Sequence, residues 1–303
     1  MPNHLLLQIA GNERLKELIS SSPVTRPVVE RFVAGDTLDD AVRVAQELKA
    51  GGVGAIFDYL GENVSTEQQA DAAMAAYIAS LRGIIALRLD AHVSVKLTQL
   101  GLDLSFESAL GRLRQIVEAA SQGPRTKVAI DMESHAYTDR TIEAYRALRP
   151  STDRLVLCLQ AYLRRTEADA GSLVALEPSV RLCKGAYDEP KEIAFGHQAT
   201  MGSYRRCLAL LLPTSPWTAV ATHDELCVKE AIRIARRRRV TADRFEFEML
   251  YGVRRDLQAA LVEQGYGVRV YLPFGTQWYP YLMRRMAERP ANLRLFVESV
   301  LRG

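Results

Sequence analysis

The chain has 303 residues, of which 48% are hydrophobic and 25% are charged, and its formal net charge is +3. This composition is typical of a soluble globular protein, and the length suits one large domain without a second core. No apolar run reaches the roughly 18 residues that a membrane-spanning helix needs, and the first residues lack the pattern of a secretory signal. We therefore expect a cytoplasmic protein with a single domain over residues 1–303 and no transmembrane segment.

The basic run at residues 236–239 is the strongest local concentration of charge. It ends a helical pattern, where cations complement the helix dipole. A nucleic-acid surface would need further basic residues on the same face. We therefore expect no nucleic-acid partner.

Helical patterns begin the chain. Residues 1–30 are expected to form an N-terminal helical extension, interrupted by Pro23 and Pro27, that packs below or beside the main fold. The following segment, TLDDAVRVAQELKA, predicts an amphipathic helix with Asp36 or Thr37 as its N-cap.

From residue 53 onward, short apolar runs alternate with helical patterns. The runs predicted to be strands are 53–60, 92–97, 127–131, 154–160, 179–184, 218–223, 245–248 and 267–271. The helical patterns that follow them are 65–82, 107–121, 138–149, 166–177, 200–211, 224–238, 254–264 and 279–288, with a last one at 292–301. Eight consecutive βα units predict an α/β protein with the (β/α)8 barrel fold of the TIM type.

A polar side chain closes each apolar run. In chain order these side chains are Asp58, Lys96, Asp131, Gln160, Lys184, His223, Glu248 and Tyr271. Because the loops after the strand C-termini build the active site of such a barrel, we expect these side chains to converge on one rim. For a single strand, a terminal polar residue can also mark only the point where the strand reaches the surface.

Common nucleotide and metal motifs are absent from the sequence. Residues 52–54 (GVG) come closest to a dinucleotide fingerprint, but they precede a strand instead of following one, and no Walker lysine motif occurs. The five histidines form no HxH or HExxH pair, so we expect no catalytic metal. The four cysteines have no CxxC spacing, which indicates buried thiols in place of disulfides or zinc ligands.

Basic side chains from two parts of the chain can meet at the barrel mouth. Lys96 and Asp131 end neighbouring strands, so the carboxylate is expected to keep the lysine charged. Tyr281, Arg284 and Arg285 follow the eighth strand on adjoining parts of one helical face. With Lys96, the two arginines can bind a carboxylate through charge-assisted hydrogen bonds. The alternatives are a structural ion pair and a solvated helix face.

A series of motifs runs in order through residues 31–290. The motifs are RFVAGDTLDDA, DYLGE, VSVKLTQLG, AIDME, LQAYLRRT, VRLCKGAY, ATHD, FEFEMLYG and YPYLMRR. The series resembles that of the proline dehydrogenase family. The chain is too short to hold an aldehyde dehydrogenase module as well, so the resemblance is to the monofunctional bacterial type.

This resemblance implies an FAD enzyme on a distorted (β/α)8 barrel that oxidises L-proline to Δ1-pyrroline-5-carboxylate, by hydride transfer to flavin N5. That reaction begins proline catabolism to glutamate. The residues implied to bind proline are Lys96, Tyr271, Tyr281, Arg284, Arg285 and Leu250, with Asp131 bonded to Lys96. The residues implied to bind FAD are Met132, Gln160, Arg181, Lys184, Gly185, Ala186, Thr222 and His223, and the implied catalytic pair is Asp131 and Arg181. Gly185 would let the chain approach the cofactor closely.

A gate is also expected at the mouth. Glu62 follows the first strand and Arg284 lies on the helix after the eighth, and because these strands are adjacent in a closed barrel, the two side chains could form an ion pair over bound substrate. The resemblance also implies partners. A quinone would accept the electrons, which implies visits to the inner face of the membrane. A separate pyrroline-5-carboxylate (glutamate semialdehyde) dehydrogenase would take the product.

Some positions depart from the family pattern, and other functions stay open. Glu248 stands where glutamine is expected, Asp224 where many relatives have asparagine, and residues 188–189 (DE) lack the tryptophan of the bifunctional forms. These departures concern the periphery of the cofactor site. A Schiff-base aldolase on the same barrel would use Lys96 or Lys184 as its nucleophile. A scaffold protein without activity is the other alternative.

Overall fold

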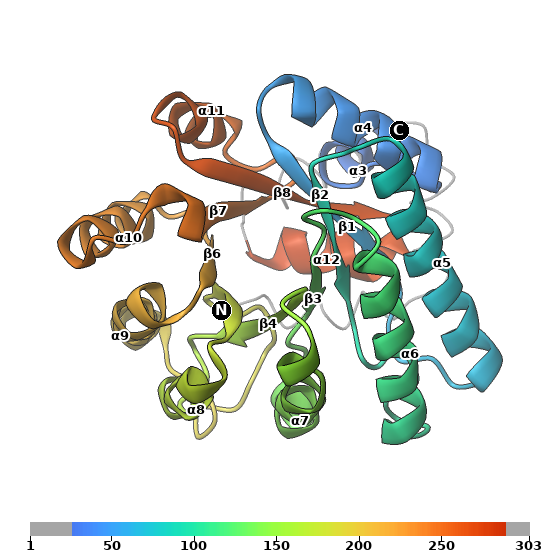
Figure 1. The fold of residues 1–303 in the computed structure, drawn as a ribbon, viewed down its shortest axis with the longest axis horizontal. Helices are drawn as coiled ribbons and strands as arrows, with labels where there is room; N and C mark the ends of the chain where they lie inside the picture. Colours follow the sequence, from blue (N-terminus) through green and yellow to red (C-terminus); the bar gives the residue numbers. More distant parts are fainter. Residues whose placement is uncertain (1–25, 289–303) are drawn as a thin grey trace.

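Eight parallel strands form a closed barrel in the computed structural model, which describes residues 26–288 and their side chains from residue 29 to residue 283 (Figure 1). The strands are β1 (Gly54–Tyr59), β2 (Ala91–Val95), β3 (Val128–Ile130), β4 (Leu155–Gln160), β5 (Ser179–Cys183), β6 (Trp217–Ala221), β7 (Phe245–Leu250) and β8 (Gly267–Phe274). Each strand pairs with the next along the chain, and β8 pairs with β1. The predicted (β/α)8 fold is confirmed.

Helices surround this barrel. They are α3 (Arg26–Phe32), α4 (Leu38–Ala50), α5 (Glu67–Ala86), α6 (Phe106–Ala120), α7 (Thr138–Leu148), α8 (Thr166–Leu173), α9 (His197–Thr214), α10 (Glu225–Arg238), α11 (Arg255–Glu263) and α12 (Trp278–Glu288). Short 3₁₀ turns are η1 (His135–Tyr137), η2 (Arg149–Ser151), η3 (Val174–Leu176) and η4 (Ala242–Arg244). The cap of α4 is Thr37, not Asp36, because the Thr37 hydroxyl and the Asp40 carboxylate exchange hydrogen bonds with each other's backbone N–H.

The place of the eighth outer helix is taken by a helix from the N-terminal side. α4, which precedes β1, contacts both β1 and β8 and covers the seam where the barrel closes. α12 follows β8 but lies across the centre of the ring in Figure 1. Its residues Tyr279, Leu282 and Met283 pack with Phe32 and Leu60 in a small core separate from the main one. The barrel is distorted in this sense, and α12 packs against the loop that follows β1.

Two strands continue at least two residues beyond their predicted ends. The seventh strand is predicted to end at Glu248 and the eighth at Tyr271, whereas β7 continues to Leu250 and β8 to Phe274. Those predicted ends are wrong because a polar side chain was taken as a sign that the strand surfaces. Glu248 is 4% exposed and pairs with Arg181 inside the barrel, so it is satisfied within the strand.

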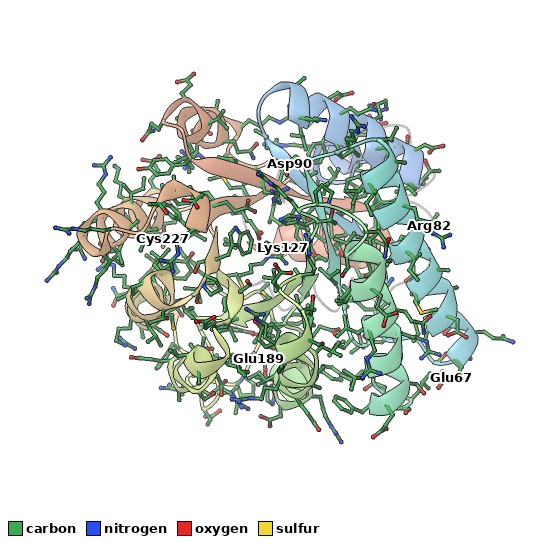
Figure 2. The ribbon with its side chains drawn as sticks, in the orientation of Figure 1. Glu67, Arg82, Asp90, Lys127, Glu189 and Cys227 are labelled. Carbon is green, nitrogen blue, oxygen red and sulfur yellow. The ribbon has the colours of Figure 1, made fainter. Side chains whose placement is uncertain are left out.

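All four cysteines are free thiols, and the prediction that they are buried is confirmed for three of them. Cys158, Cys207 and Cys227 are buried, and Cys183 is partly exposed. Cys227, labelled in Figure 2, belongs to α10, and its Sγ lies 3.9 Å from the Sδ of Met201 on α9. The three buried thiols therefore act as core side chains.

Predictions near the termini are tested only in part. Pro27 lies in the first turn of α3, where a missing N–H is tolerated, so it does not interrupt that helix. Pro23, with the rest of the extension up to residue 25, lies outside the described residues. The same holds for the helix predicted at 292–301.

Candidate active site

A buried lysine lies at the C-terminal end of β2. Its ammonium donates a hydrogen bond to β1, with 2.6 Å between Lys96 Nζ and Asp58 Oδ1. The Asp131 Oδ2 atom lies farther away, at 3.7 Å. The predicted bond between Asp131 and Lys96 is therefore corrected to an ion-pair contact, because Asp58 takes the hydrogen bond and other donors occupy Asp131.

Asp131, directly after β3, is the centre of a hydrogen-bond network inside the barrel. Its Oδ1 accepts from Ser94 Oγ at 2.6 Å and from Arg181 Nη1 at 2.7 Å, and its Oδ2 accepts from the Tyr271 hydroxyl at 2.6 Å. These donors come from β2, β5 and β8. One carboxylate thus fixes the orientation of an arginine and a tyrosine on distant strands.

Arg181 reaches across the barrel interior from β5. Its Nε donates to the Glu248 carboxylate on β7, and its Nη1 donates to Ser94 Oγ at 2.8 Å. Its guanidinium carbon lies 5.5 Å from the centre of the Tyr271 ring, within the range of a cation–π contact. Within the described part of the chain, Nη2 has no hydrogen-bond partner, so this end of the guanidinium can donate to a bound group.

The electrostatics keep Lys96 charged. Burial opposes the charge, but Asp58, Tyr271 and Asp131 together raise the pKa of Lys96 well above its usual value. For Asp58, burial raises the pKa, while Lys96 opposes that shift. An ammonium with a raised pKa suits anion binding and does not suit nucleophilic attack on a carbonyl.

Glu248 makes stability depend on pH. Burial raises its pKa to about 7 from 4.5, against the field of Arg181. The pKa of Glu248 is higher in the folded protein than in the unfolded chain. The protonated group therefore adds to the free energy of unfolding at low pH, and this contribution is lost as the pH rises from 4.5 through about 7. We expect Glu248→Gln to reduce the decrease of the free energy of unfolding with pH by about 1.4 kcal/mol per pH unit. Urea unfolding of both proteins across this range measures it, and parallel stability profiles would contradict it.

Gln160, the last residue of β4, joins the loops that follow β3 and β5. Its Nε2 donates to the backbone carbonyls of Met132 at 3.2 Å and Glu133 at 2.7 Å. Its Oε1 accepts from the Ala186 N–H at 3.4 Å. The structure thereby brings together three of the residues that the sequence analysis assigned to the cofactor.

Lys184 and Gly185 follow β5. Lys184 Nζ donates to Asp224 Oδ2 at 2.8 Å, which links the ends of β5 and β6. Gly185 has a φ of +122°, and a Cβ there would come within 2.1 Å of the Tyr162 ring. The glycine is required by this backbone conformation and by packing against Tyr162. The close approach to a cofactor that we predicted is not needed to explain it.

Thr222, His223 and Leu250 gather at the ends of β6 and β7. His223 Nε2 accepts a hydrogen bond from the Leu250 N–H at 2.8 Å, and its carbonyl accepts from Arg254 Nη1 at 3.3 Å. Thr222 Oγ1 accepts from the Asp224 N–H at 3.2 Å. A predicted substrate residue and two predicted cofactor residues are therefore neighbours.

Part of the predicted substrate site cannot be placed. The backbone of Arg284 and Arg285 belongs to α12, but their side chains lie outside the described ones. Tyr281, on the same helix, is 5% exposed. Glu62 lies in the loop between β1 and α5 and is partly exposed. The two-arginine clamp and the gate between Glu62 and Arg284 stay predictions.

Three residues of the network were given no role by the sequence analysis. Asp58 was counted among the strand ends only, and Ser94 and Glu133 were not singled out. Ser94 had a usable signal: it precedes Lys96 by two residues, so both side chains point to the same face of the strand. Glu133 follows Asp131 at the same spacing, beyond the end of β3.

The residues that depart from the family pattern have partners within the chain. Asp224 caps α10 by accepting the Leu226 N–H at 2.9 Å. The Glu189 side chain is 3% exposed and contacts His135, whose N–H donates to it at 2.8 Å. Figure 2 shows Glu189 between α8 and α7, so this contact joins the loops after β5 and β3. With Glu248 on Arg181, each of these carboxylates has a structural explanation.

Comparison with known proteins decides the family. The sequence model named Proline dehydrogenase matches residues 41–296. The chain belongs to the proline dehydrogenase family. It is 38% identical to Proline dehydrogenase 1 of Bacillus subtilis subsp. natto over the full length of both chains. It is 36% identical to Proline dehydrogenase of Deinococcus radiodurans, with 91% of each chain covered.

A solved structure supports the fold of this proline dehydrogenase family member. It is proline utilization A from Bdellovibrio bacteriovorus, inactivated by N-propargylglycine, with a TM-score of 0.80 and 23% identity. The match covers 87% of our chain and 33% of that longer chain. Among residues 26–288, no three His, Cys, Asp or Glu side chains are grouped so that they could hold a metal ion. Within the same range, no helix is long and apolar enough to cross a membrane.

Proposed function

We propose that this oxidoreductase converts L-proline to Δ1-pyrroline-5-carboxylate with FAD as its cofactor, the first step of proline catabolism to glutamate. Family membership supports the substrate and the reaction. The observation that carries the residue assignments is a buried, charged Lys96 beside a network that joins Asp131, Tyr271 and Arg181. A small zwitterion with one carboxylate needs a fixed cation and an adjoining wall of apolar and aromatic groups, and this mouth supplies both.

The polar groups at the ends of β4, β5 and β6 fit a flavin dinucleotide. The flavin ring offers carbonyl oxygens and ring nitrogens that accept hydrogen bonds, and the pyrophosphate is anionic. Arg181 and Lys184 supply donors and positive charge on this side of the mouth. The residues that we assign to the cofactor are Met132, Gln160, Arg181, Lys184, Gly185, Ala186, Thr222 and His223. When bound, FAD would supply N5 as the hydride acceptor.

Substrate binding is assigned to a second set of residues at the mouth. Lys96 holds the proline carboxylate, and Asp58 and Asp131 keep that lysine charged and in place. Arg284 and Arg285 complete the carboxylate clamp from α12. The proline ring is assigned to a wall formed by Tyr271, Tyr281 and Leu250.

Arg181 and Asp131 are assigned to the reaction itself. The Arg181 guanidinium is fixed by Glu248, Ser94 and Asp131, so it can stabilise developing negative charge without reorganising. Asp131 aligns Arg181 and the Tyr271 hydroxyl and lies within ion-pair distance of Lys96. In this assignment Asp131 orients the groups that touch substrate and cofactor.

A gate and two partners complete the proposal. Glu62 pairs with Arg284 over bound substrate and excludes water. A quinone takes the electrons, so the protein works in the cytoplasm at the inner face of the membrane. A separate pyrroline-5-carboxylate dehydrogenase accepts the product, because the pyrroline opens to a reactive semialdehyde.

Flavin reduction by substrate tests the function. Anaerobic addition of L-proline to the flavin-loaded protein is expected to bleach the flavin absorbance. Acid is expected to release the cofactor, with the mass of FAD. FMN, or flavin that stays attached to the denatured chain, would refute the cofactor assignment. A borohydride-stable adduct on Lys96 or Lys184 without flavin bleaching would favour the aldolase.

A further inference from the structure

Glu133 directs both carboxylate oxygens at a single residue. Its Oε1 accepts from the Thr98 N–H at 3.1 Å, and its Oε2 accepts from the Thr98 hydroxyl at 2.5 Å. Glu133 is 3% exposed, and Thr98 is fully buried. Thr98 follows Lys96 by two residues, so this carboxylate fixes the turn that leaves the lysine.

Thr98 holds a second segment with its other polar atoms. Its hydroxyl oxygen accepts from the Asn63 N–H at 3.3 Å, and its carbonyl accepts from the Val64 N–H at 3.4 Å. Both donors directly follow Glu62. Asn63 has a φ of +52°, a left-handed conformation that asparagine tolerates and that surrounding contacts must hold. The chain of bonds thus runs from the loop after β1, through Thr98, to Glu133.

We propose that Glu133 is a positioning residue for substrate binding, because through Thr98 it fixes both the turn that carries Lys96 and the loop that carries Glu62. The inference rests on the proposed function, which assigns the substrate carboxylate to Lys96 and the gate to Glu62. Glu133 acts through these residues and is not assigned a contact with substrate. Its own carbonyl is bound by Gln160 at 2.7 Å, so the carboxylate stands on a fixed backbone.

The charges around Glu133 support a titratable link. Burial raises its pKa to about 7, the bonds from Thr98 and the charge of Lys96 act to lower it, and Glu62 acts to raise it. Only the carboxylate accepts both Thr98 bonds, so protonation below about pH 7 removes one of them. KM for proline is therefore expected to rise as the pH falls through this value.

Isosteric variants separate this role from general stabilisation. Thr98→Val removes the hydroxyl bonds to Glu133 and Asn63 and keeps the shape, and Glu133→Gln removes the charge. Each is expected to raise KM for L-proline about tenfold, the usual effect of losing a hydrogen bond to a charged group. Flavin content and the anaerobic flavin reduction rate at saturating proline should stay near those of the parent protein. The acidic rise in KM should disappear in both variants.

Two further variants serve as controls. Thr98→Ser keeps the hydroxyl and should restore the parent KM. Thr141→Val is the matched change in α7, where the buried hydroxyl has no hydrogen-bond partner among the described residues, and it should leave KM unchanged.

A double-mutant cycle with Glu62→Ala links Glu133 to the gate loop. In the Glu62→Ala background, Thr98→Val should raise KM by less than it does alone, because only its effect on the turn that carries Lys96 remains. Thr98→Val and Glu133→Gln proteins with the parent KM, even at a lower Tm, would overturn the inference while leaving the function intact. Failure of L-proline to reduce the unmodified, flavin-loaded protein would instead overturn the proposed function and the inference with it.

Discussion

Replacing Lys96 with methionine is expected to lower kcat/KM for L-proline by two to three orders of magnitude. The change removes the cation assigned to the substrate carboxylate. It also leaves the Asp58 carboxylate without its buried counter-charge, whereas Asp131 keeps its ion pair with Arg181. Removing one partner of a buried pair costs about 3 to 5 kcal/mol. Steady-state kinetics on protein with measured flavin content would give the loss directly.

Two comparisons isolate the role of the ammonium. Lys127→Met changes a lysine next to the start of β3, at the opposite end of that strand from Asp131, and should leave KM unchanged (Figure 2). Lys96→Met combined with Asp58→Asn removes both members of the pair, so it should regain stability but not activity. A Lys96→Met protein with kcat/KM near the parent value would show that the pair is merely structural.

Replacing Arg181 with methionine is expected to slow anaerobic flavin reduction by proline by about 10² to 10³, as removal of a preorganised electrostatic donor does in other enzymes. The flavin reduction potential should fall as well, because the negative reduced form loses its counter-charge. The guanidinium is buried, where its field on nearby charge is strong. Rapid-mixing absorbance and a redox titration measure the two effects.

The single variant at Arg181 also removes a partner from Asp131 and Glu248 and can lose stability for that reason. Arg181→Met with Glu248→Gln removes the stranded charge on β7. This double variant should be more stable than the single variant, and proline should still reduce its flavin slowly. Fast reduction with an unshifted potential in this double variant would exclude a catalytic role for Arg181.

The strands could be predicted because parallel barrel strands are covered on both faces and so appear as continuous apolar runs. The errors at Glu248 and Tyr271 have a common origin. Each polar side chain is satisfied inside the barrel by a residue far along the chain, 67 residues away for Arg181 with Glu248 and 140 for Asp131 with Tyr271. No local pattern distinguishes such a buried polar residue from one that ends a strand.

The sequence predicted which side chains lie at the rim of the barrel, but not which of them bond one another. Asp58 and Asp131 both lie beside Lys96, and the choice between them depends on which other donors bind each carboxylate. Those donors sit on strands that sequence reasoning had not placed in register. Likewise, Gly185 is required because a Cβ there would clash with the Tyr162 ring. This contact joins two loops, and no sequence motif predicts it.

Closure of the barrel at the seam under α4 bears on how the protein folds. The strands β1 and β8 meet there, and Arg269 bonds the Ala55 carbonyl across a separation of 214 residues. Such pairing raises the contact order. Folding is slowed because closing so long a loop costs entropy before the stabilising contacts can form. Tyr271 reaches Asp131 only when β8 is in place. The network around the lysine is thus assembled with the last strand, and recovery of proline binding during refolding would report the completed ring.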